Sequence, residues 1–191
     1  MLKQRSGINS MDADLPLPAA SQVLETARAR RSIRKYLPTP VEDEKLAQVL
    51  EAGRIAPTAG NAQMWKFIVV RDPELVKKLV GACNNQRFVG EAPLALALCS
   101  DGEDRVMACG QRARVIDCSI ALSFMVLVAA ELGLGTCWLG NFSNEKVKRL
   151  LGVPDNCDVI AVSPLGYAAE APPARERKPA EQVICYDRWP T

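Results

Sequence analysis

Residues 115–134, VIDCSIALSFMVLVAAELGL, form the stretch of sequence that decides the fold. Its apolar residues recur on every face of a helix, and such a helix must be covered on all sides. In a chain of 191 residues, its own sheet can cover one side and a second copy of the chain the other. The alternative is the central helix of a monomer. The most apolar part, residues 120–130, is too short to cross a bilayer, so we expect no membrane partner.

Around this helix the sequence alternates helical and strand patterns, which predicts an α+β fold. Helices are expected near 21–30, 41–54, 73–82, about 104–133 and 143–151, and strands at 66–71, 93–100 and 158–167. Residues 183–186 could add a last, detached strand. We expect a flexible N-terminal arm over 1–20 and one domain with its C-terminal extension over 21–191.

The composition excludes several classes of protein. A chain that is 48% hydrophobic and 24% charged fits one globular domain with a sizeable core. The net charge of +2 is near neutral, so we expect no surface devoted to nucleic acid. The chain has no histidine, which removes Ser–His and Cys–His nucleophile pairs and histidine metal sites.

The cysteines indicate a reducing compartment. They number seven, include no Cys-x-x-Cys pair, and stand at positions 83, 99, 109, 118, 137, 157 and 185. We interpret them as reduced core thiols. The alternative is an oxygen-sensitive thiol set or a cluster site formed by Cys99, Cys109 and Cys118. Residues 1–21 are polar and show no secretory signal, so we expect a cytoplasmic protein.

A basic run, ARRSIRKY at residues 29–36, follows the first predicted helix. Arginine offers a planar fork of donors that matches phosphate oxygens two at a time, and a serine hydroxyl adds a neutral donor. The run therefore favours a phosphate monoester. A solvated basic face and a nucleic-acid patch are the alternatives.

Two further segments lie beside predicted elements. In APTAGNAQMWKF, residues 56–67, small residues and turn formers bare the backbone, and the amides of Asn61 and Gln63 can read a flat polar ligand. Taken alone, this segment is better explained as an ordinary helix-to-strand loop with a core tryptophan. In GLGTCWLGNF, residues 133–142, the glycines follow an apolar helix instead of joining a strand to a helix, which argues against a dinucleotide fingerprint.

In this order and spacing, the three segments resemble the FMN-dependent nitroreductase family. RRSIR at 30–34 resembles its phosphate motif, 56–65 its Ser-rich Asn-x-Gln-Pro-Trp segment, and 133–142 its Gly-Leu-Gly-x-x-Trp-x-Gly element. The likeness continues through PLGY at 164–167 to RERKP at 175–179, and covers roughly 21–185. Met64 replaces the usual proline, Ala59 a common serine, and Leu139 an acidic residue of some members. These departures leave FMN binding intact and the substrate preference open.

The resemblance implies a nitroreductase-like sandwich, in which helices flank a central mixed sheet and the C-terminal strand crosses to the partner of an obligate homodimer. It places the FMN phosphate on the 30–34 run and the C-terminal arginines, and the flavin ring at the subunit interface. The phosphate residues are Arg30, Arg31, Ser32 and Arg34, joined by Arg175 and Arg177. The ring would be bordered by Pro57, Thr58, Ala59 and Asn61 of the partner, by the backbone of Leu139 and Gly140 at its N5 and O4 edge, and by Asn85 at its pyrimidine edge.

By the same resemblance, the chain is an FMN-dependent NAD(P)H oxidoreductase that reduces electron-poor acceptors such as nitroaromatics or quinones in a ping-pong cycle. No side chain is expected to act as a catalytic acid. One alternative is a flavin-dependent dehydrogenase or dehalogenase with another substrate. Another is an FMN-binding sensor or scavenger without turnover. Dehalogenating and flavin-fragmenting relatives usually carry a lid insertion, and the segment between Cys99 and Val115 is too short for a large one.

Overall fold

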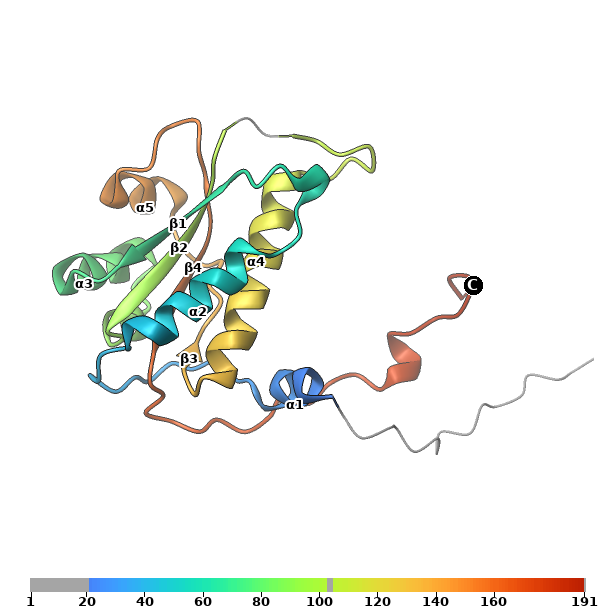
Figure 1. Cartoon of the computed structure of the whole chain (residues 1–191), viewed down its shortest axis with the longest axis horizontal. Helices are drawn as coiled ribbons and strands as arrows, with labels where there is room; N and C mark the ends of the chain where they lie inside the picture. Colours follow the sequence, from blue (N-terminus) through green and yellow to red (C-terminus); the bar gives the residue numbers. More distant parts are fainter. Residues whose placement is uncertain (1–20, 103–104, 191) are drawn as a thin grey trace, which may run out of the picture.

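The computed structural model describes residues 21–102 and 105–190, so the predicted arm at 1–20 lies outside it. Figure 1 shows five α-helices around a small sheet. The helices are α1 (Gln22–Ala29), α2 (Asp43–Arg54), α3 (Pro73–Ala82), α4 (Ala113–Glu131) and α5 (Asn144–Leu151). The strands are β1 (Trp65–Val70), β2 (Leu94–Ser100), β3 (Gly135–Thr136) and β4 (Val159–Gly166). The α+β prediction is therefore confirmed.

The sheet has the order β1-β2-β4-β3, and each of these strand pairs is antiparallel. This differs from the mixed sheet that we expected. Among the described residues, a parallel pairing occurs only as the isolated bridge between Ser32 and Thr136. The chain after α1 contributes this bridge and an antiparallel one between Tyr36 and Ala168 instead of a strand.

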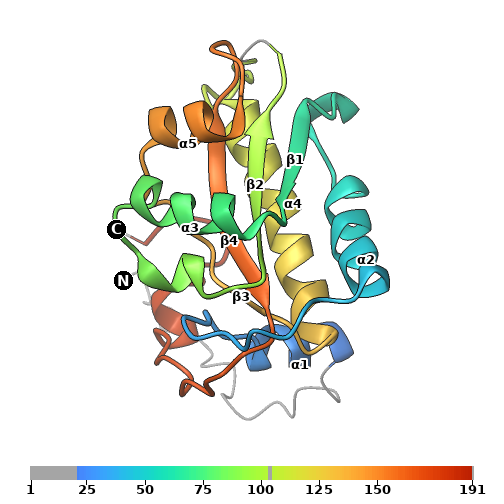
Figure 2. The ribbon, with the colours of Figure 1, turned by 90° about the vertical axis from the view of Figure 1, so that its left-hand side faces the viewer.

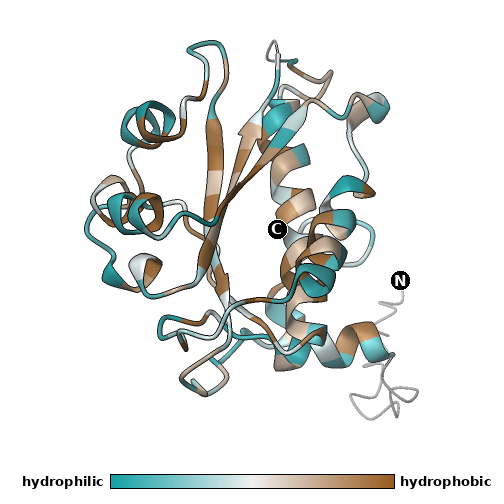
Figure 3. Cartoon of the chain, turned by 60° about the vertical axis from the view of Figure 1, so that its left-hand side comes forward, coloured by the Kyte–Doolittle hydropathy of each residue, from teal (hydrophilic) through white to brown (hydrophobic). Residues whose placement is uncertain are grey.

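Helices cover both faces of this sheet (Figures 2 and 3). Every residue of β2 is buried, and successive side chains of a strand point to opposite faces. Leu94, Leu96 and Leu98 therefore pack in the cluster that contains α2 and α4. Ala95 and Ala97 pack in the cluster on the other face, with α3 and α5. The core thus lies in two layers, one on each side of the central strand.

Helix α4 begins at Ala113 and not near residue 104, which corrects the sequence prediction. The preceding residues form a tight turn instead, because Gly110 has a φ of 82° and Met107 N–H donates to the Gln111 carbonyl at 2.9 Å. By length and composition α4 could cross a membrane, but it contributes eight buried residues to the protein. This burial is typical of the core helix of a globular domain.

The segment after β4 runs back past α1 and then away from the sheet (Figure 1). The strand expected at 183–186 is absent from the described residues, where the chain forms only a short 3-10 turn at Ala180–Gln182. Val183, Ile184, Tyr186 and Trp189 are exposed, and Trp189 reaches 87%. Without a neighbouring strand, this apolar segment has no ladder to join within the single chain.

Candidate active site

A cationic cleft of about 710 Å³ lies where the chain leaves α1 and meets the segment that follows β4. None of its lining residues is acidic. The polar side chains that line it are Arg28, Arg30, Arg31, Ser32, Arg34, Arg175 and Arg177. Guanidinium groups gathered in this way suit an anion with several oxygens, such as a phosphate. The structure thus brings together both groups of basic residues that the sequence predicted as one phosphate site.

Two buried side chains hold residues 32–36 against the domain and leave the cleft residues on the outer side. Ile33 and Tyr36 are buried, and the Ile33 N–H donates to the Thr136 carbonyl of β3 at 2.9 Å. The Tyr36 hydroxyl donates to the Ile33 carbonyl at 2.8 Å. Because Ile33 is anchored inward, its neighbours Ser32 and Arg34 lie on the outer side, in the cleft.

The arginines of the cleft differ in what they contact. Arg31 Nη1 donates to three carbonyl oxygens at the end of α1, those of Arg28 at 2.6 Å and of Ala29 and Arg30 at 2.9 Å. It therefore caps the helix, because the last carbonyls of a helix lack internal partners. Arg34 instead lies over the Phe88 ring, 5.9 Å from its centroid. Of the predicted phosphate residues, Arg31 thus uses its Nη1 donor to cap α1.

The positive charges of Arg30 and Arg34 act on Cys137, the first residue after β3. Burial raises the pKa of the Cys137 thiol, while the positive charges of Arg34 and Arg30 act to lower it and Glu170 acts to raise it. The Glu170 carboxylate accepts the backbone N–H of Arg34. Cys137 is therefore within electrostatic reach of Arg30 and Arg34 of the cleft.

Residues 137–140 alternate between the core and the surface. Cys137 and Leu139 are buried, whereas Trp138 is 46% exposed and Gly140 is exposed. The Leu139 N–H donates to the Val162 carbonyl at 2.9 Å. Its amide is thus already paired within the chain, so the peptide N–H that the sequence predicts as a donor at this segment is not that of Leu139. Within the described residues Gly140 N–H makes no hydrogen bond, so it is the donor of this pair that can meet one.

Asn85 lies close to the same segment. Asn84 and Asn85 both have left-handed backbone, with φ values of 52° and 60°, and both are exposed. The Asn84 side-chain amide donates to the Asn141 side chain at 2.7 Å, and Gln86 donates to the Asn141 carbonyl at 2.8 Å. These bonds hold the turn after α3 against the residue that follows Gly140, so the structure brings Asn85 to this side of the site.

The predicted flavin-bordering loop lies elsewhere in the chain. Pro57, Thr58, Ala59 and Asn61 follow α2, and the Ala59 N–H donates to the Asp117 carboxylate near the start of α4 at 3.1 Å. The cationic cleft lies beside α1, at the other end of α4 (Figure 1). At 1.5 Å per residue, the helix from Asp117 to Glu131 spans about 21 Å. One chain therefore does not bring this loop to the phosphate residues.

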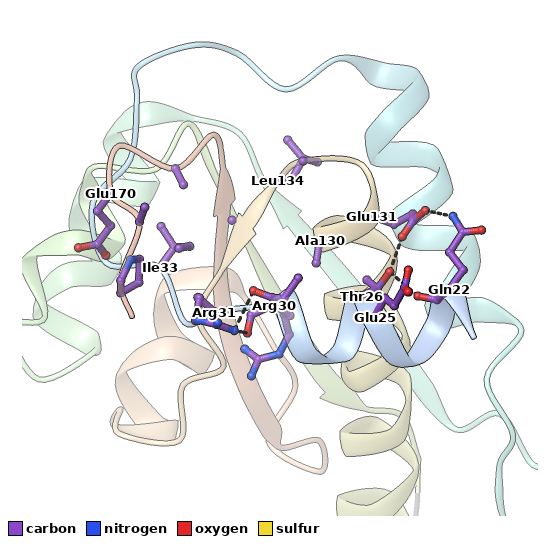
Figure 4. Close-up of a pocket in the computed structure, with 16 residues that line it drawn as sticks. Gln22, Glu25, Thr26, Arg30, Arg31, Ile33, Ala130, Glu131, Leu134 and Glu170 are labelled. Carbon is purple, nitrogen blue, oxygen red and sulfur yellow. Dashed lines mark hydrogen bonds between the residues drawn. The ribbon is translucent and has the colours of Figure 1, made fainter. Parts of the chain in front are cut away.

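A larger cavity of about 900 Å³ adjoins the cleft and shares Arg30, Arg31 and Pro172 with it. It lies between α1, the last turn of α4, β3 and residues 168–172 (Figure 4). Its wall is fixed by Glu131, whose carboxylate accepts hydrogen bonds from Gln22 and Thr26 of α1. These residues could not be predicted from the sequence, because nothing in the local pattern indicates that α1 packs on the end of α4.

The cysteines do not form the alternative cluster. Cys99 and Cys118 are buried and Cys109 is exposed. Residues 21–102 and 105–190 contain no group of three or more His, Cys, Asp or Glu side chains placed to hold a metal ion.

The antiparallel sheet between helix layers and the arginine cleft define an α+β protein with a cationic cleft at one end. The sequence matches the nitroreductase family over residues 27–86 and 81–167. The chain belongs to this family, and it is an oxidoreductase. It is 37% identical over 150 residues to a putative NADH dehydrogenase/NAD(P)H nitroreductase of Archaeoglobus fulgidus, covering 76% of this chain and 85% of the relative.

Solved structures show the same fold. A nitroreductase family protein of Clostridium difficile superposes with a TM-score of 0.78 at 34% identity, covering 89% of this chain and 100% of that protein. The NADPH:FMN oxidoreductase of Vibrio harveyi, solved in complex with NAD⁺, gives a TM-score of 0.82 at 27% identity, over 88% of this chain and 78% of that one.

Proposed function

We propose that this chain is an FMN-dependent NAD(P)H oxidoreductase that reduces electron-poor acceptors such as nitroaromatics or quinones. The observation that best supports this proposal is the cleft that gathers the arginines of residues 28–34 and 175–177 without a lining carboxylate. The name of the Vibrio harveyi relative, NADPH:FMN oxidoreductase, supports the same cofactor and the same electron donor.

The described residues fit FMN in chemistry. Arg30, Ser32 and Arg177 offer charged and neutral donors for the phosphate, and all three line the cleft. Gly140 offers its N–H to the N5 and O4 edge of the ring, and Asn85 its amide to the pyrimidine edge. When bound, FMN supplies a hydride acceptor that passes electrons on to a second substrate. Arg34 brings positive charge, which favours an anionic reduced ring.

The proposal includes a homodimer. Because the 57–61 loop lies about one helix length from the cleft, a site that uses both must take the loop from a second copy of the chain. Two exposed apolar surfaces support such a partner. One is on α4, where the side chains of Val115 and Phe124 are exposed, and the other is the tail at 183–189, whose strand would form on the partner's sheet.

In this proposal the protein orients the flavin and its substrates and supplies positive charge, and no side chain needs to transfer a proton. The chain has no histidine, and five of its seven cysteines are buried. Water can protonate the product. The nicotinamide and the acceptor would use the same cavity in turn, which is a ping-pong cycle. The free thiols fit a reducing compartment, so we place the enzyme in the cytoplasm.

The deciding experiment is the absorption spectrum of the purified protein, followed by anaerobic titration with NADH and with NADPH. We expect a yellow protein that is bleached by at least one nucleotide and reoxidised by a quinone or a nitroaromatic. Steady-state kinetics should give parallel double-reciprocal lines. Retained FMN that bleaches slowly with both nucleotides would instead indicate a sensor or scavenger, and intersecting lines would indicate separate sites for the two substrates.

A further inference from the structure

Asp117 is a buried carboxylate of α4 that does not line the cationic cleft. The residue is 4% exposed, and its Oδ1 accepts the Ala59 N–H at 3.1 Å. Burying a carboxylate is costly unless it is hydrogen-bonded. The bond also joins two elements that are 58 residues apart in sequence. Asp117 therefore anchors the loop after α2 to α4.

The loop that it holds has an unusual backbone. Gly60, Asn61 and Gln63 have φ values of 62°, 55° and 51°, all in the left-handed region. Residues other than glycine rarely adopt this backbone conformation, and they keep it only when surrounding contacts fix them. Thr58 supplies two such contacts, because its carbonyl accepts the Asn61 N–H at 3.0 Å and its hydroxyl accepts the Gln63 N–H at 3.2 Å.

The contacts made by Thr58 lie within the loop, so they shape it without placing it on the domain. The Ala59 N–H bond to Asp117 does place it, since α4 is the central helix of the core. A second, longer contact comes from Arg105, whose Nη1 donates to the Ala59 carbonyl at 3.4 Å. Of the two, the bond to the buried carboxylate of Asp117 is the shorter.

We propose that Asp117 is a positioning residue that pre-organises residues 58–63 for the flavin ring of the neighbouring subunit. This inference rests on the proposed function, in which that loop borders the ring. Asp117 itself would touch neither cofactor nor substrate. It would act through Ala59, by keeping the loop in its bound conformation before the flavin arrives.

The test measures FMN and riboflavin dissociation constants for Asp117→Ala. The loop would meet the ring and not the phosphate, so both flavins should bind about tenfold more weakly. Arg30→Ala is the matched contrast and should weaken FMN alone. Asp117→Asn should restore both affinities, because its amide oxygen can still accept the Ala59 N–H. Hydrogen exchange of the peptide covering 56–64 should rise in Asp117→Ala without flavin and return in Asp117→Asn.

A second variant removes the donor instead of the acceptor, in case Asp117→Ala does not fold. Ala59→Pro has no N–H, and Thr58 before it is already extended at φ −131° and ψ 157°, as a residue before proline should be. It should raise exchange in 56–64 as Asp117→Ala does. Lys148→Met is the stability control, because it removes another buried hydrogen bond, to the Asp155 carbonyl, in α5. It should lower the Tm and leave flavin affinity and loop exchange unchanged.

The outcomes separate this inference from the proposed function. If the unmutated protein binds no flavin, the proposed function fails. If it binds FMN, but Asp117→Ala and Ala59→Pro fold with unchanged affinities and unchanged exchange, Asp117 is not a positioning residue. Loss of both affinities in Asp117→Asn as well would overturn the role of the hydrogen bond.

Discussion

The Leu139 N–H donates to the Val162 carbonyl at 2.9 Å, and the Val162 N–H returns a bond to the Leu139 carbonyl at 3.3 Å. This two-way pairing fixes the segment after β3 against β4 and uses the polar groups of Leu139. Gly140 follows at the surface with its N–H unpaired among the described residues. The side chain at position 139 can therefore change without altering the unpaired amide, whereas a proline at position 140 removes it.

We accordingly predict that Gly140→Pro weakens FMN and riboflavin alike. Proline removes the N–H, and Leu139 before it is already in an extended pairing that tolerates a following proline. Leu139→Met is the control and should leave both affinities near their original values, because the backbone donor remains. Titrations followed by flavin fluorescence measure both. Equal behaviour of the two variants would contradict the assignment of Gly140.

Arg30 and Arg31 should behave differently although they are neighbours. Arg30→Ala removes a charge-assisted hydrogen bond to phosphate worth about 1.5 to 3 kcal/mol, so FMN affinity should fall roughly tenfold to a hundredfold. Riboflavin, which lacks the phosphate, should bind as before. Arg31→Ala removes the cap of α1 and should mainly lower the Tm. Isothermal titration of each variant with both flavins, beside thermal unfolding, distinguishes the two roles.

Arg34 should affect the redox potential of the bound flavin. Its positive charge favours an anionic reduced ring, so Arg34→Ala should make the midpoint potential more negative and slow reduction by the nicotinamide. Arg34→Lys keeps the charge and should recover much of the potential. Dye-equilibration titrations under anaerobic conditions report this directly. A potential that is the same in all three proteins would place the Arg34 charge away from the ring.

Much of the fold follows from local patterns. Helix α3 occupies the predicted residues 73–82, where Asp72 accepts the Glu74 N–H and caps the first turn at 2.9 Å. The predicted start of α4 was wrong because a turn with left-handed Gly110 precedes the helix, and hydrophobic periodicity does not reveal such a turn. Strand β3 was missed because it has two residues, and its pairing of Gly135 with Gly166 is a long-range contact.

The site was predictable in its parts and not in its arrangement. The basic runs at 30–34 and 175–177 could be found as charge clusters, and the structure places both in one cleft. Arg31 donates to carbonyls at the end of α1, and Leu139 pairs with Val162. Both contacts use backbone carbonyls, whose positions cannot be predicted from the pattern of side chains. The glycines at 135 and 166 carried a signal for close packing, since a Cβ at these positions would meet Ile33 and Pro93 at 2.8 and 2.5 Å.

The thiols provide two tests, and the first needs no flavin. Burial raises the pKa of Cys83 and Cys99 to about 11 and that of Cys118 to about 12. At neutral pH these groups are protonated and should react only as the pH approaches those values, because the thiolate is the nucleophile. We expect at most two fast thiols in the native protein, Cys109 and Cys185, and seven after unfolding. Replacing any one cysteine with serine should leave the rate of flavin reduction unchanged.

Phe124 provides the sharpest test of the dimer. Its side chain is 40% exposed on α4 in the single chain, so a charge there would be harmless to a monomer. In the proposed dimer the same face is covered, and an unpaired carboxylate would be buried at a cost of several kcal/mol. Phe124→Glu should therefore give a folded monomer by light scattering that has lost its yellow colour. Leu37→Glu, at a similarly exposed apolar residue outside α4, is the control and should remain a yellow dimer. An unmutated protein that holds stoichiometric FMN as a monomer, or a Phe124→Glu variant that does so, would show that one chain completes the site alone.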